Sequence, residues 1–463
     1  MFRKKVGDLN LKILHRFTQM KRSDFGEDFS WGVSTAAYQI EGAHNKYGKG
    51  NSIWDEFVKR KRKIAKGHHG NHTCDFYHQY ESDLDLMKAM HIKNFRFSIS
   101  WSRIFPEGYG RVNQDGLDFY NKLIDECLQR DITPWITLYH WDLPDALEKQ
   151  GGWTNRNIVH WFTDYVDMCS RKFGDRVKYW MVLNEPMVFT GAGYFLGVHA
   201  PGKKGVKNFL PAAHHAVLCQ AQGAQVLRSN LTKAEIGTTF SCSHLEPATN
   251  SEKDILACKR MDALLNRMFI EPALGKGYPI DDLKLLNRME EFCKPGDDKL
   301  SLFDFDFIGI QNYTREIISH VFYIPYLQAK IIKASKRKVP ITVMDWEVYP
   351  NSIYQMLHKF SAYNIKNIVV TENGAAFDDY LMDGMVHDIE REDYLKQYLN
   401  EVYKAKQEGI PVTGYFVWSF MDNFEWAEGY DPRFGLVYVD FQTQERIIKR
   451  SGHWYREFLS GDE

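Results

Sequence analysis

Eight short apolar runs, spread over the 463 residues, constrain the fold of this chain more than any other feature. Each run is six to nine residues long and rich in β-branched and aromatic residues, which is typical of strands. Amphipathic stretches such as 116–130 and 155–173 lie between them, with the i, i+3, i+4 apolar spacing of a surface helix. The runs are residues 29–35, 95–100, 134–140, 179–185, 235–241, 305–313, 368–374 and 414–420.

Alternation of strand and helix over the whole chain predicts a (β/α)8 TIM barrel. We expect one domain over residues 24–463, preceded by a flexible N-terminal extension, residues 1–23. A doubly wound open sheet is the alternative, although no G-x-G-x-x-G follows the first run. The connections 41–93 and 314–366 exceed ordinary loops between strand and helix, so we expect them to build a deep pocket.

Composition excludes several classes of function. The chain is 44% hydrophobic and 26% charged, as in a soluble globular protein, and no apolar run is long enough to predict a membrane span. A net charge of −1 argues against nucleic acid or an anionic membrane as the partner, so we interpret the basic run 59–63 as a solvated loop. Seven cysteines without C-x-x-C spacing favour a reducing, cytoplasmic location. The oligomeric state, a homo-oligomer included, stays open.

Two of the runs end in a carboxylate. Glu185 closes the run 179–185 and precedes Pro186, and Glu372 stands near the end of the run 368–374. A buried carboxylate is costly unless it is paired, hydrogen-bonded or protonated, and active residues of barrels gather at the carboxyl ends of strands. Other polar or aromatic residues stand in or just after the runs: Gln39, Arg96, His140, Asn184, Tyr313 and Trp418.

Two carboxyl groups facing each other across a barrel mouth favour glycoside hydrolysis, in which one donates a proton and the other attacks or activates water. Metal binding is less favoured, because His68, His69 and His72 lack a framework of carboxylates or cysteines and are better explained as a loop. No G-x-S-x-G motif supports a serine hydrolase.

A sugar also needs polar groups for its hydroxyls and an aromatic face for its ring. The stretch 414–435 brings Trp418, Glu425 and Trp426 close together in sequence. Glu425 is able to accept two hydroxyl hydrogen bonds, so the cluster predicts a sugar site.

Six motifs together resemble family 1 glycoside hydrolases, the β-glucosidase family: FSWGVSTAAYQIEGA, FRFSISWSRIFP, TLYHWDLP, VLNEP, VTENG and WSFMDNFEWAEGY. The resemblance runs from about Asp24 to the end of the chain. It implies a (β/α)8 barrel that hydrolyses β-glycosides or short oligosaccharides with retention of configuration. It also implies that no cofactor and no metal is needed.

Carried over by motif, the resemblance makes Glu185 the acid/base and Glu372 the nucleophile, with Arg96 and Tyr313 in contact with the nucleophile. We expect Arg96 to lower the pKa of Glu372, and Glu185 to stay protonated near neutral pH. The substrate-binding residues would be Gln39, His140, Trp141, Asn184, Trp346, Trp418, Glu425, Trp426 and Phe434.

The resemblance also narrows the substrate. Related thioglucosidases carry Gln at the position of Glu185, so O-glycosides are favoured. Related 6-phospho-β-glucosidases bind phosphate where this chain has Glu425, which favours an unphosphorylated sugar. Asp345, beside Trp346, is expected to add polarity on the leaving-group side. The sequence does not show whether glucose, fucose or galactose is the preferred sugar. A transglycosidase and a non-catalytic sugar-binding protein are the alternatives to a hydrolase.

Overall fold

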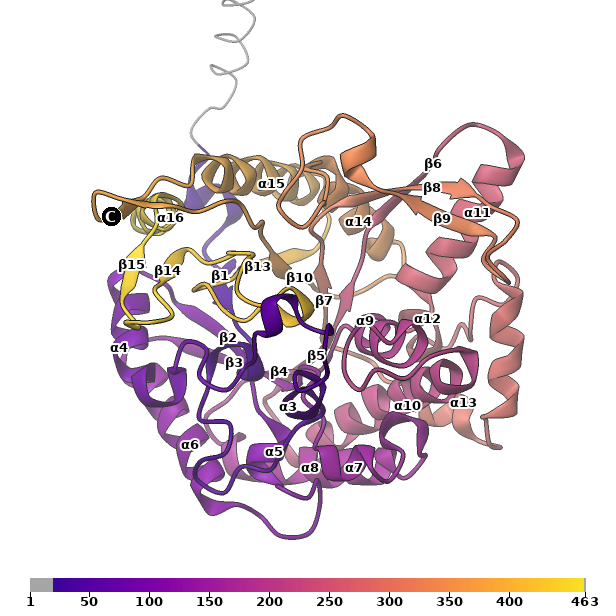
Figure 1. Ribbon diagram of the computed structural model, residues 1–463, viewed down its shortest axis with the longest axis horizontal. Coiled ribbons are helices and arrows are strands. Elements are labelled where there is room, and N and C mark those ends of the chain that lie inside the picture. Colours follow the sequence, from indigo (N-terminus) through magenta and orange to yellow (C-terminus); the bar gives the residue numbers. More distant parts are fainter. Residues whose placement is uncertain (1–19, 462–463) are drawn as a thin grey trace, which may run out of the picture.

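The computed structural model describes residues 20–461, which form a closed barrel of eight parallel strands (Figure 1). The strand order is β1-β13-β10-β7-β5-β4-β3-β2, and β1 pairs with β2 to close the ring. Each predicted run overlaps one strand, so the TIM barrel is confirmed and the open sheet is excluded. The strands are β1 (Ser30–Ser34), β2 (Asn94–Ser98), β3 (Thr133–Tyr139), β4 (Tyr179–Asn184), β5 (Glu235–Ser241), β7 (Phe307–Gln311), β10 (Ile368–Asn373) and β13 (Val412–Trp418).

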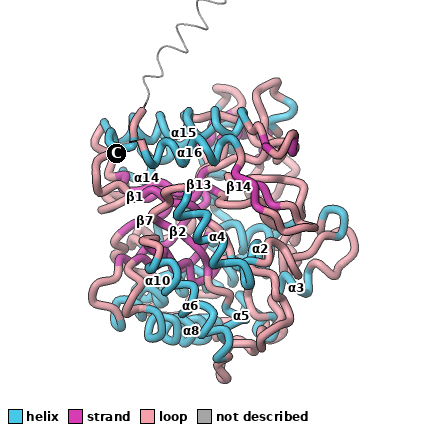
Figure 2. The backbone as a smooth tube through the Cα atoms, turned by 90° about the vertical axis from the view of Figure 1, so that its left-hand side faces the viewer, coloured by secondary structure: helices cyan, strands magenta, loops and turns pink. Residues whose placement is uncertain are grey.

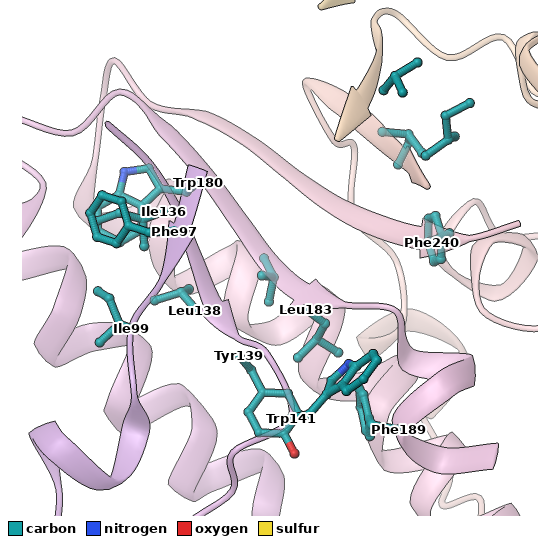
Figure 3. Packing of buried hydrophobic residues seen from close by; sticks show 14 of the residues in the cluster. Phe97, Ile99, Ile136, Leu138, Tyr139, Trp141, Trp180, Leu183, Phe189 and Phe240 are labelled. Carbon is teal, nitrogen blue, oxygen red and sulfur yellow. The ribbon is translucent and has the colours of Figure 1, made fainter. Parts of the chain in front are cut away.

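Helices surround the barrel, with the strands on the inside (Figure 2). The two predicted amphipathic stretches form α6 and α8, which turn their apolar faces inward. Figure 3 shows part of the layer between strands and helices, where Phe97, Ile136 and Trp180 gather. The longer helices are α4 (Phe76–Ala89), α6 (Gln114–Gln129), α8 (Ile158–Phe173), α10 (Val206–Asn230), α11 (Glu252–Asp262), α14 (Asn351–Ser361), α15 (Ile389–Gln407) and α16 (Arg450–Ser460). The shorter ones are α2 (Ala37–Ile40), α3 (Ile53–Phe57), α5 (Trp101–Ile104), α7 (Asp145–Glu148), α9 (Pro186–Thr190), α12 (Ile270–Ala273) and α13 (Asp297–Leu300).

The two long connections contain structure of their own. Connection 41–93 ends in the barrel helix α4, and connection 314–366 ends in α14. The second also carries β8 (Arg315–His320) and β9 (Ala329–Ile332), which join β6 (His244–Pro247) in a small sheet outside the barrel (Figure 1). Two further strand pairs complete the fold, β11 (Leu381–Met382) with β12 (Met385–Val386), and β14 (Val437–Val439) with β15 (Arg446–Ile448).

Several sequence features lie away from the barrel interior. Of the expected extension 1–23, residues 1–19 lie outside the described part, and Arg22–Phe25 form a short 3-10 helix. The basic run is partly packed, since Arg60 donates to the carbonyl of Pro201 and Lys63 to that of Gly197. Within residues 20–461, no helix is long and apolar enough to cross a membrane, and no group of three or more His, Cys, Asp or Glu side chains is arranged to hold a metal ion.

A cluster of mostly aromatic side chains closes the inside of the barrel. Trp135, Met181, Phe307, Val369 and Phe416 form one buried cluster although they come from five different strands. Trp135 on β3 lies 4.9 Å, centroid to centroid, from Phe416 on β13, and these strands are not neighbours in the ring. Because such strands meet only across the interior, the cluster forms a floor beneath the carboxyl ends of the strands.

We expect Trp135→Ala to lower the free energy of unfolding by about 3–5 kcal/mol, because it leaves a cavity at the centre of this floor. The midpoint of urea-induced unfolding measures the effect. Leu302→Ala is the control, since Leu302 is 44% exposed and its loss should change stability by no more than about 0.5 kcal/mol. Equal midpoints for the two variants would contradict a structural role for the floor.

Candidate active site

A cavity of about 300 Å³ opens at the carboxyl ends of the barrel strands. Its size suits a small organic ligand. Most of the predicted site residues line it: His140, Trp141, Glu185, Tyr313, Trp346, Glu372, Trp418, Glu425, Trp426 and Phe434. The remaining three, Gln39, Arg96 and Asn184, are fully buried and hydrogen-bond to residues of the lining.

Glu372, on β10, is held by three donors. Arg96 forms an ion pair with Oε1, and Gln311 donates to the same oxygen at 2.8 Å. The Tyr313 hydroxyl donates to Oε2 at 2.6 Å. Both carboxylate oxygens are therefore fixed, which sets the direction in which this group faces the cavity.

Arg96 is itself held in place. Its side chain is fully buried and donates to Thr137 at 3.0 Å and to Asn184 Oδ1 at 2.5 Å. Asn184 Oδ1 also accepts from Gln311 at 2.7 Å and from Thr239 at 3.0 Å. A polar layer therefore rests on the aromatic floor, and it joins residues from six strands or strand ends.

Glu185 lies where β4 turns into α9. Its backbone has φ 47°, in the left-handed region that a non-glycine residue rarely adopts, and Pro186 begins the helix behind it. The backbone N–H donates to the carbonyl of Thr239 at 3.0 Å. This turn brings the side chain over the cavity, and no cation pairs with it among residues 20–461. Strained backbone of this kind is common at functional sites.

The two glutamates differ in their pKa. Burial and the charge of Glu372 raise the pKa of Glu185 well above its usual value. Burial also raises the pKa of Glu372, but Arg96 and Tyr313 act in the opposite direction. The expected effect of Arg96 is therefore present, although burial outweighs it. The proton shared by this pair resides on Glu185, because only Glu372 has a cation beside it.

His140 is neutral and has one nitrogen without a protein partner. Burial and Arg96 lower its pKa well below the usual value. Asn184 Oδ1 is occupied by three donors, so its amide nitrogen donates to His140 Nε2 at 3.0 Å. The proton of the ring must then sit on Nδ1, for which no partner exists among the described residues. Nδ1 is a free donor at the cavity.

Glu425 directly precedes the short 3-10 helix Trp426–Glu428, beyond the end of β13. Gln39 Nε2 lies 3.4 Å from Glu425 Oε2 and donates to the carbonyl of Phe424 at 2.9 Å. Burial, and secondarily Glu372, raises the pKa of Glu425 to about 8. The carboxyl group has few protein partners and is able to bond to a ligand.

Aromatic rings form the walls. Trp426 packs against Trp54 with centroids 4.6 Å apart and against Trp141 at 4.5 Å. On another side, Trp346 lies 5.2 Å from Tyr313 and 6.0 Å from Phe434. The predicted aromatic residues are thus brought together in two groups, as required for binding the apolar faces of a ring.

Some positions differ from expectation or were missed. Asp345 does not line the cavity, and its carboxylate accepts hydrogen bonds from Ser335 at 2.7 and 3.0 Å, although its charge still acts on Glu316 of the lining. Gln311, Ser241 and Glu316 belong to the site but were not predicted. Their position near the ends of β5 and β7 or at the start of β8 was the only available signal. His68, His69 and His72 do not line the cavity.

A protonated carboxyl group and a second one fixed by a cation, on the walls of one cavity, are able to combine acid catalysis with nucleophilic attack. None of the steps that this pair can carry out requires a metal or an organic cofactor.

Comparison with known proteins agrees with this chemistry. Residues 21–463 match glycosyl hydrolase family 1. The chain is 44% identical to "Beta-glucosidase A" of Thermotoga maritima over 96% of its length and 99% of the relative's. It is 43% identical to a "1,4-beta-D-glucan glucohydrolase" of Thermotoga neapolitana, covering 95% and 98%.

Solved structures agree as well. A family 1 glycoside hydrolase of Thermotoga maritima, complexed with a cyclophellitol analogue described as a transition state mimic, superposes with a TM-score of 0.90 at 43% identity. The match covers 94% of this chain and 98% of that one. The motifs, the barrel and these matches together show that the protein belongs to glycosyl hydrolase family 1.

Proposed function

We propose that the protein is a retaining β-glucosidase that removes terminal, non-reducing β-D-glucosyl residues through a covalent glycosyl-enzyme. One observation carries this proposal. Glu372 is fixed by Arg96, Tyr313 and Gln311, and it shares the cavity with Glu185, which has no cation bonded to it and whose pKa is raised by burial and by the charge of Glu372. The family is one of glycoside hydrolases, and relatives at 43–44% identity are β-glucosidases by name.

In the first step Glu185 donates its proton to the glycosidic oxygen, while a carboxylate oxygen of Glu372 attacks the anomeric carbon. The bond from carbon to the leaving oxygen breaks as the bond to Glu372 forms. The leaving group departs as a neutral alcohol, and Glu185 is left as a carboxylate. Arg96 and Tyr313 fix the attacking group in advance, so little reorganisation is needed at the moment of reaction.

In the second step the roles of proton donor and acceptor are reversed. Glu372 is now an ester and carries no charge, so the largest electrostatic cause of the raised pKa of Glu185 disappears. Glu185 accepts a proton from water, and the hydroxyl group adds to the anomeric carbon. The ester bond breaks, Glu372 returns to a carboxylate, and the two inversions together retain the configuration.

The sugar ring is bound by the groups that the protein leaves unsatisfied. His140 Nδ1 donates to one hydroxyl and Glu425 accepts from others, while Gln39 keeps one buried oxygen free. Trp418 and Trp426 provide apolar faces on the cavity wall. Asn184, whose amide nitrogen lies 3.5 Å from Glu185 Oε2, is in reach of the 2-hydroxyl, whose hydrogen bonds strengthen in the transition state.

A phosphorylated sugar does not suit this cavity. No lysine or arginine of the described chain lines it, and Glu425 stands where a phosphate partner would be needed. Moving a phosphate out of water without a cation costs several kcal/mol. We therefore assign unphosphorylated β-glycosides as substrates.

We also propose a cytoplasmic location. All seven cysteines are free, and five of them are buried. Unpaired thiols persist best in a reducing compartment.

A panel of p-nitrophenyl glycosides, with cellobiose alongside, tests the proposed function. We expect turnover of the β-D-glucoside and the β-D-fucoside, which share the 2- and 3-hydroxyl groups nearest the reacting carbon, and none of the β-glucoside 6-phosphate. The rate on the galactoside measures how well Glu425 and Gln39 accept a 4-hydroxyl group of the opposite configuration. If no unphosphorylated β-glycoside is hydrolysed, the proposed function is refuted and a sugar-binding protein is favoured.

Glu372→Gly should reduce kcat roughly 10⁴-fold or more, because the nucleophile is lost. Added azide should restore turnover of the aryl glucoside and yield an α-glycosyl azide. The small anion occupies the space left by the Glu372 side chain and attacks the anomeric carbon from the face that Glu372 would attack. The product is identified by NMR. Glu372→Gln, which keeps the volume but offers no room for azide, is the matched control and should not be rescued. A β-configured azide would remove Glu372 from the nucleophile role.

Glu185→Gln should lower kcat/KM by about 10²–10⁴-fold on cellobiose but far less on 2,4-dinitrophenyl β-glucoside, which needs no proton from the enzyme. Because the acid form of Glu185 is lost as pH rises through its raised pKa, the wild type should lose activity on the alkaline side. That alkaline limb should vanish in the variant. Equal losses on both substrates would argue against an acid role.

A further inference from the structure

The cavity holds more carboxyl groups than cleavage of the glycosidic bond uses. Five glutamates line it, and within the described chain no lysine or arginine does. Glu185 and Glu372 carry the proposed chemistry, and Glu425 faces the sugar. Glu316 and Glu428 have no role in that scheme.

Glu316 lines the part of the cavity around Trp346, which the resemblance to family 1 assigns to the leaving group. It belongs to β8, three residues after Tyr313, and shares the lining with Met344 and Trp346. Trp346 packs against Tyr313 and Phe434, so the wall beside Glu316 is aromatic. A group bound here would sit beyond the anomeric carbon, on the side from which the leaving group departs.

The carboxyl group of Glu316 has no hydrogen-bond or ion-pair partner among residues 20–461, although two arginines are close in sequence or space. Arg315 donates to Glu246 at 3.0 Å and to Glu347 at 2.8 and 2.9 Å. Arg337 donates to Glu347 at 2.5 Å. The three guanidinium nitrogens of Arg315 are thus occupied, whereas Nε and Nη2 of Arg337 have no hydrogen-bond partner among residues 20–461. Neither arginine bonds to Glu316, so its half-buried carboxyl group is left for a ligand.

The charged groups around Glu316 act in opposite directions. Burial raises its pKa to about 7, Arg337 opposes this, and Asp345 and Glu347 add to it. The group is therefore ionised above about pH 7 and neutral below. A positive charge brought beside it would favour the ionised form further.

We propose that Glu316 makes this protein prefer β-glucosides whose leaving group carries a positive charge, such as a protonated amine, over neutral and anionic ones. The inference rests on the proposed function and specifies its substrate class. A carboxylate that lines the same cavity as the Trp346 ring offers an ammonium group an ion pair, and the ring offers it a cation–π contact. The same environment penalises a carboxylate or sulfate on the leaving group, because like charges would meet where water is partly excluded.

Three aryl β-D-glucosides of similar shape test this preference: 4-(aminomethyl)phenyl, 4-(hydroxymethyl)phenyl and 4-carboxyphenyl. The measured quantity is the kcat/KM of each charged substrate divided by that of the hydroxymethyl compound. This quotient is determined for the wild type and for Glu316→Gln, and the first is divided by the second. Differences in the intrinsic reactivity of the leaving groups are the same for both proteins and therefore cancel. We expect the wild type to favour the cation roughly three- to tenfold relative to Glu316→Gln, and to disfavour the anion by a similar factor.

Glu428→Gln is the matched control, because it removes the same charge from another part of the lining. It should leave most of the preference for the cation in place. Equal loss of the preference in both variants would mean that it arises from the overall negative field of the cavity, which overturns the assignment to Glu316.

The pH dependence provides a second readout. Between about pH 5.5 and 8.5 the aminomethyl group stays protonated. Within this window the wild-type quotient for the cation should rise as Glu316 ionises near pH 7, and that of Glu316→Gln should stay flat. Ionisation of Glu185 and Glu372 affects all three substrates alike and cancels in the quotient.

The outcomes separate this inference from the proposed function. If none of the three glucosides is hydrolysed, the proposed function fails. If all three are hydrolysed and Glu316→Gln changes neither quotient, the proposed function stands and the role of Glu316 is refuted. A merely structural role for Glu316 would lower kcat/KM for the three substrates equally and leave the quotients unchanged.

Discussion

The ion pair between Arg96 and Glu372, inside the barrel, determines much of the surrounding structure. An ionised carboxylate in this position would be strongly destabilising without a fixed cation, and an unpaired guanidinium would be equally so. Both groups are almost completely shielded from solvent, and Thr137, Asn184 and Gln311 satisfy their remaining hydrogen-bonding capacity. The aromatic floor around Trp135 lies below this layer and shields it from the other end of the barrel. The apolar and polar layers therefore depend on each other.

The same arrangement separates the two glutamates by environment. Both are buried, so burial alone would raise both pKa values. Arg96 and the Tyr313 hydroxyl stabilise the charge on Glu372, and that charge in turn disfavours ionisation of Glu185. One carboxyl group is thereby kept as a base or nucleophile and the other as an acid, which is the division of labour that a retaining glycosidase needs. In the proposed mechanism this coupling disappears when Glu372 becomes an ester, so a single electrostatic contact serves both steps.

The sequence predicts the barrel well because each strand is a short apolar run, and a parallel barrel gathers the carboxyl ends of all its strands at one rim. Glu185, Glu372, His140 and Tyr313 could be placed together on that basis. The partners of each polar group could not, since they depend on the local register. The pairing of β4 with β5 shifts between Met181 and Asn184, and that of β10 with β7 shifts between Val370 and Glu372. Such irregularities re-aim side chains, so the contacts of Gln311 with both Asn184 and Glu372 followed only from the structure. Asp345 lies outside the lining for a related reason, because its loop turns the carboxylate toward Ser335.

The two sides of the cavity are built differently, and this has a functional consequence. The catalytic and sugar-binding groups are linked to one another through Arg96, Asn184 and Gln311, so a change at any of them disturbs the others. The side that we assign to the leaving group is formed by β8 and by the loop that carries Met344 and Trp346, which belong to a connection outside the barrel. Glu316 has no bond to the catalytic network. A residue in this position can change the charge preference for the leaving group while the chemistry of bond cleavage stays the same, which is how loops on a rigid barrel diversify specificity.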